Sequence, residues 1–223
     1  MAKDTAAQPT DMTLDELRPV LARELPKDAS FDGWGAKAVA AAAQRIGADP
    51  AVAALVFPDG AVDMIAAWFE TIDGDMRAAW PTEKVAALKI RERITVLVEA
   101  RLTLLAPHRE ALRRAQAILA RPSNGTKALK LGWHAADAMW NAAGDTATDY
   151  NHYTKRAILG SVYAATLLVF VNDDSDDHGD TRAFLGRRIE GIMRFEKTKA
   201  RLTSGGDRHF SMARFLGRLR YPA

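Results

Sequence analysis

The chain contains no cysteine. A disulfide framework, a catalytic thiolate and a cysteine-ligated metal site are therefore excluded. It also lacks a long apolar run, because the most apolar stretch, residues 157–171, falls short of the roughly 20 residues that cross a bilayer. Tyr163 and Thr166 interrupt that stretch, which predicts a buried core helix in a soluble protein. Residues 1–12 have no apolar core either, so we expect a short disordered lead rather than a signal peptide.

The patterns that carry catalytic chemistry are missing as well. The five histidines show neither the H-E-x-x-H spacing of a zinc site nor the Glu-x-x-His pairs of a di-iron bundle. The acidic run 173–177 could suggest calcium, but it lacks the glycine and the terminal glutamate of an EF-hand. A solvated loop that caps the helix from Thr181 is the favoured interpretation. We therefore expect no catalytic residue, no metal, no cofactor and no enzymatic activity.

What is present is a helical pattern along almost the whole chain. Its 223 residues are 48% hydrophobic and 26% charged, the balance of one globular domain. Apolar residues recur at helical spacing, and no alternating run is long enough for a sheet. The predicted helices cover residues 13–24, 34–46, 50–57, 61–72, 81–107, 108–120, 125–142, 150–172 and 179–200. The predicted fold class is all-α.

Three short helices followed by longer ones match the outline of a TetR-type transcriptional regulator, so DNA binding is the alternative function. A helix that reads bases needs Arg, Lys, Asn or Gln, with basic residues near the phosphates. Residues 50–57, which would enter the groove, contain none of these. Asp49, Asp59 and Asp63 around them have the wrong charge for DNA. The sequence thus predicts a degenerate helix-turn-helix that does not bind nucleic acid.

The C-terminal part is basic and amphipathic. From Arg194 onward there are eight basic residues and two acidic ones, whereas the remainder of the chain has a net charge of −3. After the glycines of residues 204–206, apolar residues recur at i, i+3, i+4 and i+7 beside arginines, as in a helix that lies on an anionic membrane. Docking on the chain's own domain or on a dimer mate is the alternative. The predicted membrane-binding residues are Arg208, Phe210, Met212, Arg214, Phe215, Leu216, Arg218 and Leu219.

The segment 139–156 combines a helix end, a helix start and a crowd of aromatic residues. Gly144 suits the left-handed position just past a helix end, and Thr146-x-x-Asp149 is typical of a capping box. A capped corner does not require aromatics, yet the segment also contains Trp140, Tyr150, His152 and Tyr153. A docking surface and a packed corner are equally good interpretations of these residues.

This segment also resembles the signature of a family of ubiquinone-biosynthesis accessory proteins, the ninth of the Coq proteins, which bind lipid and have a TetR-like fold. Other blocks in the same order extend the resemblance over most of the chain. They are Gly33-Trp34, residues 55–60, 81–85, 91–94 and 108–111, Val162-Tyr163-x-x-Thr166, and residues 184–189. Two positions depart from the family pattern, His152 where Trp is usual and Ala147 where Ser is usual.

The resemblance implies a TetR-like helical bundle that binds an isoprenoid quinone precursor or a phospholipid in an apolar pocket. Two helical faces would line that pocket, although the same stripes are more often plain core. The implied lipid-binding residues are Met64, Ile65, Trp68, Phe69, Ile72, Ile158, Val162, Tyr163, Thr166, Leu167 and Phe170.

The same resemblance implies a partner, the demethoxyubiquinone hydroxylase, to which the lipid would be presented. Its docking patch, carried over residue by residue, consists of Met139, Trp140, Asp149, Asn151, His152 and Tyr153. A homodimer through the last long helices is expected from the TetR-like architecture. The expected organisation is a lead (1–12), a lipid-binding domain (13–203) with its helix-turn-helix part at 13–60 and its ligand and dimerisation part at 61–203, and a membrane helix (204–223). We expect a cytoplasmic protein, peripheral on the inner membrane surface.

Overall fold

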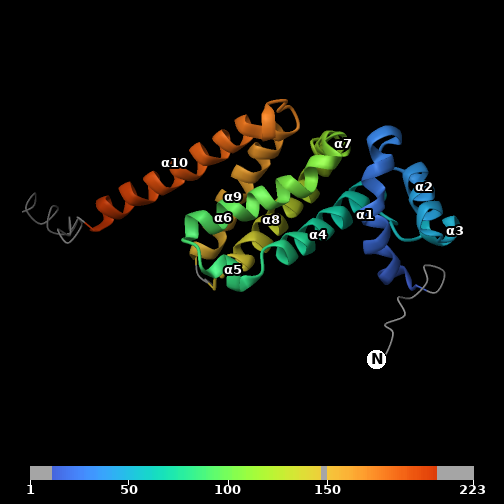
Figure 1. Cartoon of the computed structure of the whole chain (residues 1–223), viewed down its shortest axis with the longest axis horizontal. Coiled ribbons are helices and arrows are strands. Elements are labelled where there is room, and N and C mark those ends of the chain that lie inside the picture. The colour runs from blue at the N-terminus through green and yellow to red at the C-terminus, as the bar shows by residue number, and fades with distance from the viewer. Residues whose placement is uncertain (1–11, 147–149, 205–223) are drawn as a thin grey trace, which may run out of the picture. The chain divides into compact units, whose positions relative to one another are not determined.

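The computed structural model describes residues 12–146 and 150–204, with the side chains of residues 12–146 and 152–192. Within this part every regular element is helical, as predicted (Figure 1). The α-helices are α1 (Leu14–Asp32), α2 (Ala36–Ile46), α3 (Pro50–Ala53), α4 (Ala61–Ala79), α5 (Thr82–Ala86), α6 (Ile90–Leu105), α7 (Arg109–Leu119), α8 (Gly125–Ala142), α9 (Tyr150–Phe170) and α10 (Gly179–Ser204). Short 3-10 turns are η2 (Ala106–His108), η3 (Pro122–Asn124) and η4 (Asp176–His178).

The chain divides into two compact units, residues 1–185 and residues 186–223. The boundary between these units lies within α10. In the first unit α1 packs against α2, α4 and α7, and α4 packs against α6 and α8. Helices α8 and α9 form a hairpin with an extensive contact between them. This bundle buries the core of the protein and positions the corner singled out in the sequence.

Helix α1 is longer than predicted. Thr13 is its N-cap and forms a capping box with Glu16, whose backbone N–H donates to Thr13 Oγ1 at 3.3 Å. The prediction that this helix ends near Glu24 was wrong, because α1 continues through Pro26 to Asp32. An interior proline removes one helix hydrogen bond, but the flanking Leu25 and Ala29 are fully buried. Their burial outweighs the local cost of the proline.

Three other predicted boundaries were also wrong, and the first is the end of the helix predicted over residues 50–57, which stops at Ala53. Helix α4 continues beyond Ile72 because Asp73 and Met76 are buried rather than exposed at a helix end. The single long helix expected from Pro81 is instead α5 and α6, which are separated at Leu88 and Lys89. A local cap explains the restart of the helix, since the backbone N–H of Lys89 donates to Glu92 Oε2 at 3.0 Å.

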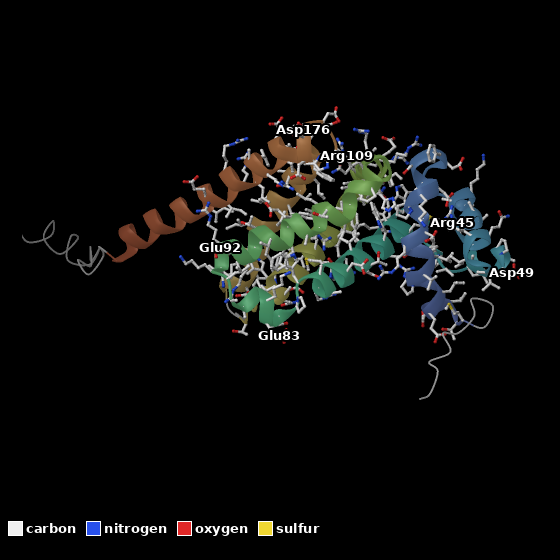
Figure 2. The ribbon with its side chains drawn as sticks, in the orientation of Figure 1. Arg45, Asp49, Glu83, Glu92, Arg109 and Asp176 are labelled. Carbon is white, nitrogen blue, oxygen red and sulfur yellow. The ribbon has the colours of Figure 1, made fainter. Side chains whose placement is uncertain are left out.

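The N-terminal helices α1–α3 have the order of a helix-turn-helix, but α3 is a single turn of four residues. Leu55, just after it, is 64% exposed. Arg45 at the end of α2 is engaged by α1, with Nη1 3.1 Å from Glu24 Oε2 and Nη2 2.7 Å from Asp28 Oδ1. Figure 2 labels Arg45 on α2 and Asp49 at the start of α3. A short apolar helix beside neutralised or acidic side chains is a poor surface for DNA.

Within the described ranges, no helix combines the length and the hydropathy that crossing a bilayer requires.

Candidate functional site

The corner between α8 and α9 begins with the helix end that Gly144 predicted. Gly144 has a φ of 82°, and its N–H donates to the carbonyl of Asn141 at 3.0 Å. The N–H of Asp145 donates to the carbonyl of Trp140, also at 3.0 Å. These two bonds form a Schellman motif, which ends a helix with a left-handed residue. The predicted capping box starting at Thr146 depends on residues 147–149 and lies outside the described residues.

A charge network holds this corner together. Arg156 of α9 is 1% exposed; its Nε lies 2.5 Å from Asp137 Oδ1, and its Nη1 lies 3.1 Å from Asp145 Oδ2. Lys155 Nζ lies 2.8 Å from the other oxygen of Asp145. Partial burial raises the pKa of Asp145, but the hydrogen bonds from Lys155 and Arg156 outweigh it and lower the pKa below its usual value. The network therefore fixes α9 to the end of α8.

Arg93 of α6 makes a second set of hydrogen bonds to the same corner. Its Nη1 donates to the carbonyl of Ala143 at 2.9 Å, at the end of α8. Its Nε and Nη2 donate to the carbonyls of Leu88 and Ala86, each at 2.8 Å. One guanidinium thus satisfies carbonyls at two helix ends. No local sequence pattern links Arg93 to Ala143, so this contact could not be predicted from the sequence.

The aromatic residues of the corner divide into a packed part and an exposed part. Trp140 is half-buried; its Nε1 donates to the carbonyl of Lys155 at 3.1 Å, and the ammonium of Lys155 lies 5.3 Å from its ring. Tyr153, in contrast, is 61% exposed. Its ring centroid lies 6.0 Å from that of Trp133 on α8 and 5.1 Å from that of His152. Trp140 is thus packed into the corner and Tyr153 is exposed on it, while docking at this surface stays a prediction.

The six residues of the predicted docking patch are not all available on one surface. Met139 is fully buried, so in this structure its side chain belongs to the core and offers no contact surface. Tyr153 and, in part, His152 and Trp140 are accessible. Asp149 and the side chain of Asn151 lie outside the described residues. We name the accessible aromatic group, Trp133, Trp140, His152 and Tyr153, the aromatic corner.

The predicted lipid-binding residues belong mainly to the core. Trp68 packs between Trp34 and Phe69, with ring centroids 5.2 and 5.3 Å away. Phe69 and Ile158 are half-buried, and the remaining nine of the set are buried. The helices that carry the two stripes, α4 and α9, are linked by Arg101 of α6, which donates to Asp73 on α4 and to Tyr163 on α9. Whether these residues bind lipid stays a prediction.

A cavity of about 220 Å³ lies between α4 and α8. Among the predicted lipid-binding residues, Phe69 lines it. The remaining lining is mostly small or polar and consists of Ala66, Glu70, Asp73, Arg77, Leu131, His134, Ala135, Asp137, Ala138 and Asn141. Pockets that enclose drug-sized ligands are about 300–1,000 Å³. In this conformation the cavity accommodates a small polar group and not an isoprenoid chain.

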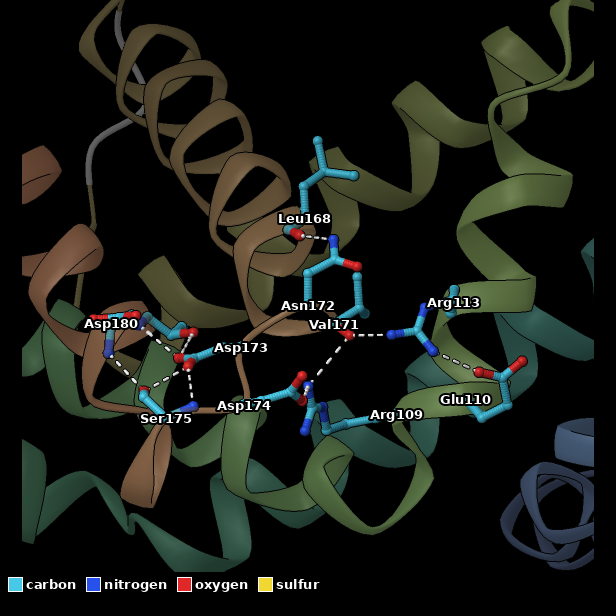
Figure 3. Close-up of polar contacts among 11 residues, drawn as sticks. Arg109, Glu110, Arg113, Leu168, Val171, Asn172, Asp173, Asp174, Ser175 and Asp180 are labelled. Carbon is cyan, nitrogen blue, oxygen red and sulfur yellow. Dashed lines mark hydrogen bonds and ion pairs between the residues drawn. The ribbon is translucent and has the colours of Figure 1, made fainter.

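The acidic loop after α9 acts as a cap rather than as a ligand shell. Asp173 Oδ2 accepts from the backbone N–H of Thr181 at 2.8 Å. Asp173 Oδ1 accepts from the backbone N–H of Ser175 at 2.9 Å (Figure 3). The predicted capping of the helix at Thr181 is confirmed, but Asp173 is buried rather than solvated. Four hydrogen bonds from Ser175 and Thr181 outweigh the effect of burial and lower the pKa of Asp173 far below its usual value. In the described part of the chain, no three His, Cys, Asp or Glu side chains are grouped to hold a metal ion.

The carbonyl end of α9 is held from α7. Arg109 Nη2 donates to the carbonyl of Val171 at 3.3 Å, and Arg113 donates to the same oxygen (Figure 3). Cationic side chains at a helix C-terminus stabilise its partial negative charge. The predicted membrane-binding residues 208–219 lie outside the described residues.

Comparison of the sequence with known proteins shows similarity to the COQ9 proteins. Residues 125–196 match the COQ9 family model. The "Ubiquinone biosynthesis protein COQ9, mitochondrial" of Rattus norvegicus is 35% identical over 182 residues, which cover 78% of this chain and 58% of that protein. The protein of the same name from Homo sapiens is 34% identical over 181 residues, which cover 78% of this chain and 57% of that protein. The chain thus spans less than three fifths of the length of these two relatives.

A solved structure supports the fold independently. The TetR transcriptional regulator from Nitrosomonas europaea ATCC 19718 superposes with a TM-score of 0.61 over 78% of this chain and 96% of its own, at 21% identity. Identity that low shows a shared fold and not a shared function. The resemblance seen in the sequence is confirmed as a similarity to the COQ9 ubiquinone-biosynthesis proteins, and the described helices have a TetR-like fold.

Proposed function

We propose that this chain is a non-catalytic accessory protein of ubiquinone biosynthesis, which lifts an isoprenoid quinone precursor from the membrane and presents it to the demethoxyubiquinone hydroxylase. The observation that carries the proposal is its 35% identity over 182 residues to a COQ9 protein. An accessory lipid carrier addresses a physical problem of that pathway, since exposing apolar surface to water costs about 25 cal/mol per Å². A helical bundle that encloses the apolar part of the substrate avoids this cost.

The alternative, a ligand-sensing regulator, takes support from the likeness to a TetR regulator. The chemistry of the helix-turn-helix argues against it. Helix α3 has one turn, Val52 and Leu55 present apolar surface, and Arg45 is neutralised by carboxylates on α1. Since phosphate neutralisation supplies most non-specific affinity for DNA, we propose that these three helices serve as scaffold.

We further propose that the aromatic corner is where the hydroxylase docks. Aromatic residues dominate the energy of protein interfaces when they are anchored in place. Tyr153 fits this requirement, because it is 61% exposed yet lies against Trp133 and His152. The charge network around Arg156 beneath it keeps the surface rigid, so little ordering entropy would oppose binding.

A homodimer through α8 and α9 is also part of the proposal. Leu129 on α8 is 79% exposed and Leu168 on α9 is 59% exposed. Exposed leucines on a helical hairpin are typical of surfaces that a second helical pair covers. The basic segment beyond residue 204 would then bring the protein to the surface of the inner membrane, where its lipid substrate resides.

Mass spectrometry of organic extracts tests the central claim. The full chain is purified from a lysate that contains membranes, washed, and extracted with organic solvent. The same amount of an unrelated helical protein, treated in the same way, is the control. We expect quinone-type or phospholipid species at a stoichiometric level in the first extract and not in the second. An extract without lipid, together with a sequence-selective shift of duplex DNA, would identify a regulator instead.

A further inference from the structure

The most unusual buried group of the molecule is the guanidinium of Arg101, on α6. Its side chain has no exposed surface. Nη1 donates to Asp73 of α4, and Nε donates to the phenol oxygen of Tyr163 of α9 at 2.9 Å. The guanidinium also lies 5.0 Å from the centre of the Tyr163 ring. Arg101 thus connects α4 and α9, the two helices that carry the predicted lipid-binding stripes.

The third nitrogen of this guanidinium, Nη2, makes no hydrogen bond to the residues that the structure describes. This nitrogen is also buried. Buried polar groups in folded proteins are almost always paired, because an unpaired N–H loses its hydration without compensation. A donor held in that state by its neighbours is suited to receive an acceptor from outside the chain.

The position of Asp73 shows how such an acceptor would arrive. Asp73 lines the 220 Å³ cavity between α4 and α8 and, at the same time, accepts from Arg101. The cavity therefore reaches Asp73, whereas Arg101 is not among its lining residues. Phe69, one turn earlier on α4, lines the same cavity and provides an apolar wall. A head group that enters here would contact Asp73, and a movement of the Asp73 side chain would open the way to Nη2 of Arg101.

The charge of the site decides which oxygen it accepts. Asp73 neutralises Arg101, and Glu70 and Asp137 add carboxylates to the cavity wall. Arg77 lies on the same wall, and Asp137 is paired with Arg156. A phosphate would bring a further negative charge into a region that already contains carboxylates, which is unfavourable when the charge is desolvated. A neutral carbonyl or ether oxygen meets no such penalty.

We propose that Arg101 Nη2 is the polar anchor for the head group of the bound lipid and donates to a neutral ring oxygen, as a quinone presents. This inference rests on the proposed lipid-binding function. Arg101 acts as a binding residue, with Asp73 and Tyr163 as positioning residues that hold its planar guanidinium in place. The isoprenoid tail would have to occupy other space, because the cavity is too small for it.

The test uses the full chain labelled with ¹⁵N-arginine, with ubiquinone-1 (one isoprene unit) as the probe. Arg101→Lys retains a cation for Asp73 but removes Nη2, and we expect its affinity for ubiquinone-1 to fall about tenfold or more. Arg114→Lys is the matched control, since it makes the same change at an arginine that is 42% exposed and does not line the cavity. Its affinity should change less than about threefold. Thermal melting verifies that each variant is folded.

The guanidinium signals of the wild-type protein provide a readout that does not depend on a variant. We expect the Nη signal of Arg101, assigned from its loss in Arg101→Lys or by ¹³C-coupled experiments, to shift on addition of ubiquinone-1 and to ignore inorganic phosphate. Binding of ubiquinone-1 with no change at Arg101 would overturn the anchor and leave the lipid-binding function standing. A response to phosphate alone would also overturn it, in favour of a phospholipid head group. No binding of either ubiquinone-1 or phospholipid vesicles would reject the proposed function itself.

Discussion

Arg156 Nη1 of α9 lies 3.1 Å from Asp145 Oδ2, in a pair whose side chains are 2% and 7% exposed. This contact joins the start of α9 to the residue that follows the Schellman turn of α8. A buried pair of this kind is costly to break, because the remaining charge keeps its desolvation without its partner. The corner is therefore a rigid support, and what it supports is the exposed face of Tyr153.

Asp145→Asn tests the support directly. The change removes the charge that Lys155 and Arg156 share, so we expect a loss of about 2–4 kcal/mol in the free energy of unfolding. Chemical denaturation measures it. Asp174→Asn is the matched control, because the side chain of Asp174 is 93% exposed and its ion pair with Arg109 should contribute less than about 1 kcal/mol. Equal losses in the two variants would contradict the role of the buried network.

The pH dependence of stability should carry the signature of His108. Partial burial lowers the pKa of His108 from its usual value of 6.5, and the positive charge of Lys27 lowers it further. As the pH falls below about 6.5, the unfolded chain is protonated before the folded one, so stability decreases there and levels off below the folded pKa. Above this range His108 is neutral in both the folded and the unfolded state, so it does not make the stability depend on pH. Melting temperatures of wild type and His108→Gln between pH 7.5 and 5 measure the effect, and the exposed His134→Gln is the control. An identical pH profile for His108→Gln and wild type would rule out a contribution of His108 to the pH dependence of stability.

Tyr153→Asp separates docking from packing. Because Tyr153 is 61% exposed, we expect the melting temperature to change little. Binding of the hydroxylase should weaken by at least tenfold, since an unpaired carboxylate would be buried in the interface. Leu55→Asp, a charge at another exposed apolar position on the N-terminal helices, is the matched control. If the two variants bind the hydroxylase equally well, the aromatic corner is not the docking surface.

Removal of residues 204–223 tests the membrane segment. The basic and apolar residues of that segment should supply most of the affinity for anionic vesicles, at about 1 kcal/mol for each basic residue near the surface. We expect the truncated chain to melt like the full chain and to stay in the supernatant when vesicles are sedimented. A variant with Arg214, Arg218 and Arg220 changed to Gln should bind vesicles weakly and lose its salt dependence. Vesicle binding that survives the truncation would place the membrane contact elsewhere.

Duplex DNA should not bind at moderate salt. The reason is the charge around the apolar turn α3, where Asp49 is acidic and the nearby Arg18 and Arg45 are already paired with carboxylates. Electrophoretic mobility with random and genomic fragments measures this. A sequence-selective shift that disappears when residues 50–57 are changed would show that the helix-turn-helix is functional.

Local signals in the sequence were sufficient to predict most helix ends and the fold class. Thr13 with Glu16, and Gly144 with its left-handed φ, act through atoms within a few residues of each other, so their geometry follows from neighbouring residue types. The ordered blocks of the family resemblance likewise needed no coordinates. Where the local rules failed, as at Pro26 and Leu88, burial of neighbouring side chains or a competing cap decided the outcome.

Only the tertiary structure decided what the buried charges do. Arg101 meets Asp73 and Tyr163 from 28 and 62 positions away along the chain, and Arg93 meets Ala143 from 50. No periodicity or capping pattern links residues that far apart, because packing of the helices sets those distances. The same packing made Met139 part of the core and left Tyr153 exposed, although both stood in one aromatic stretch of sequence. The helical spacing of apolar residues determined that the chain is all-α, and the packing of its helices determined which polar groups are buried, which are paired and which are left without a partner among the described residues.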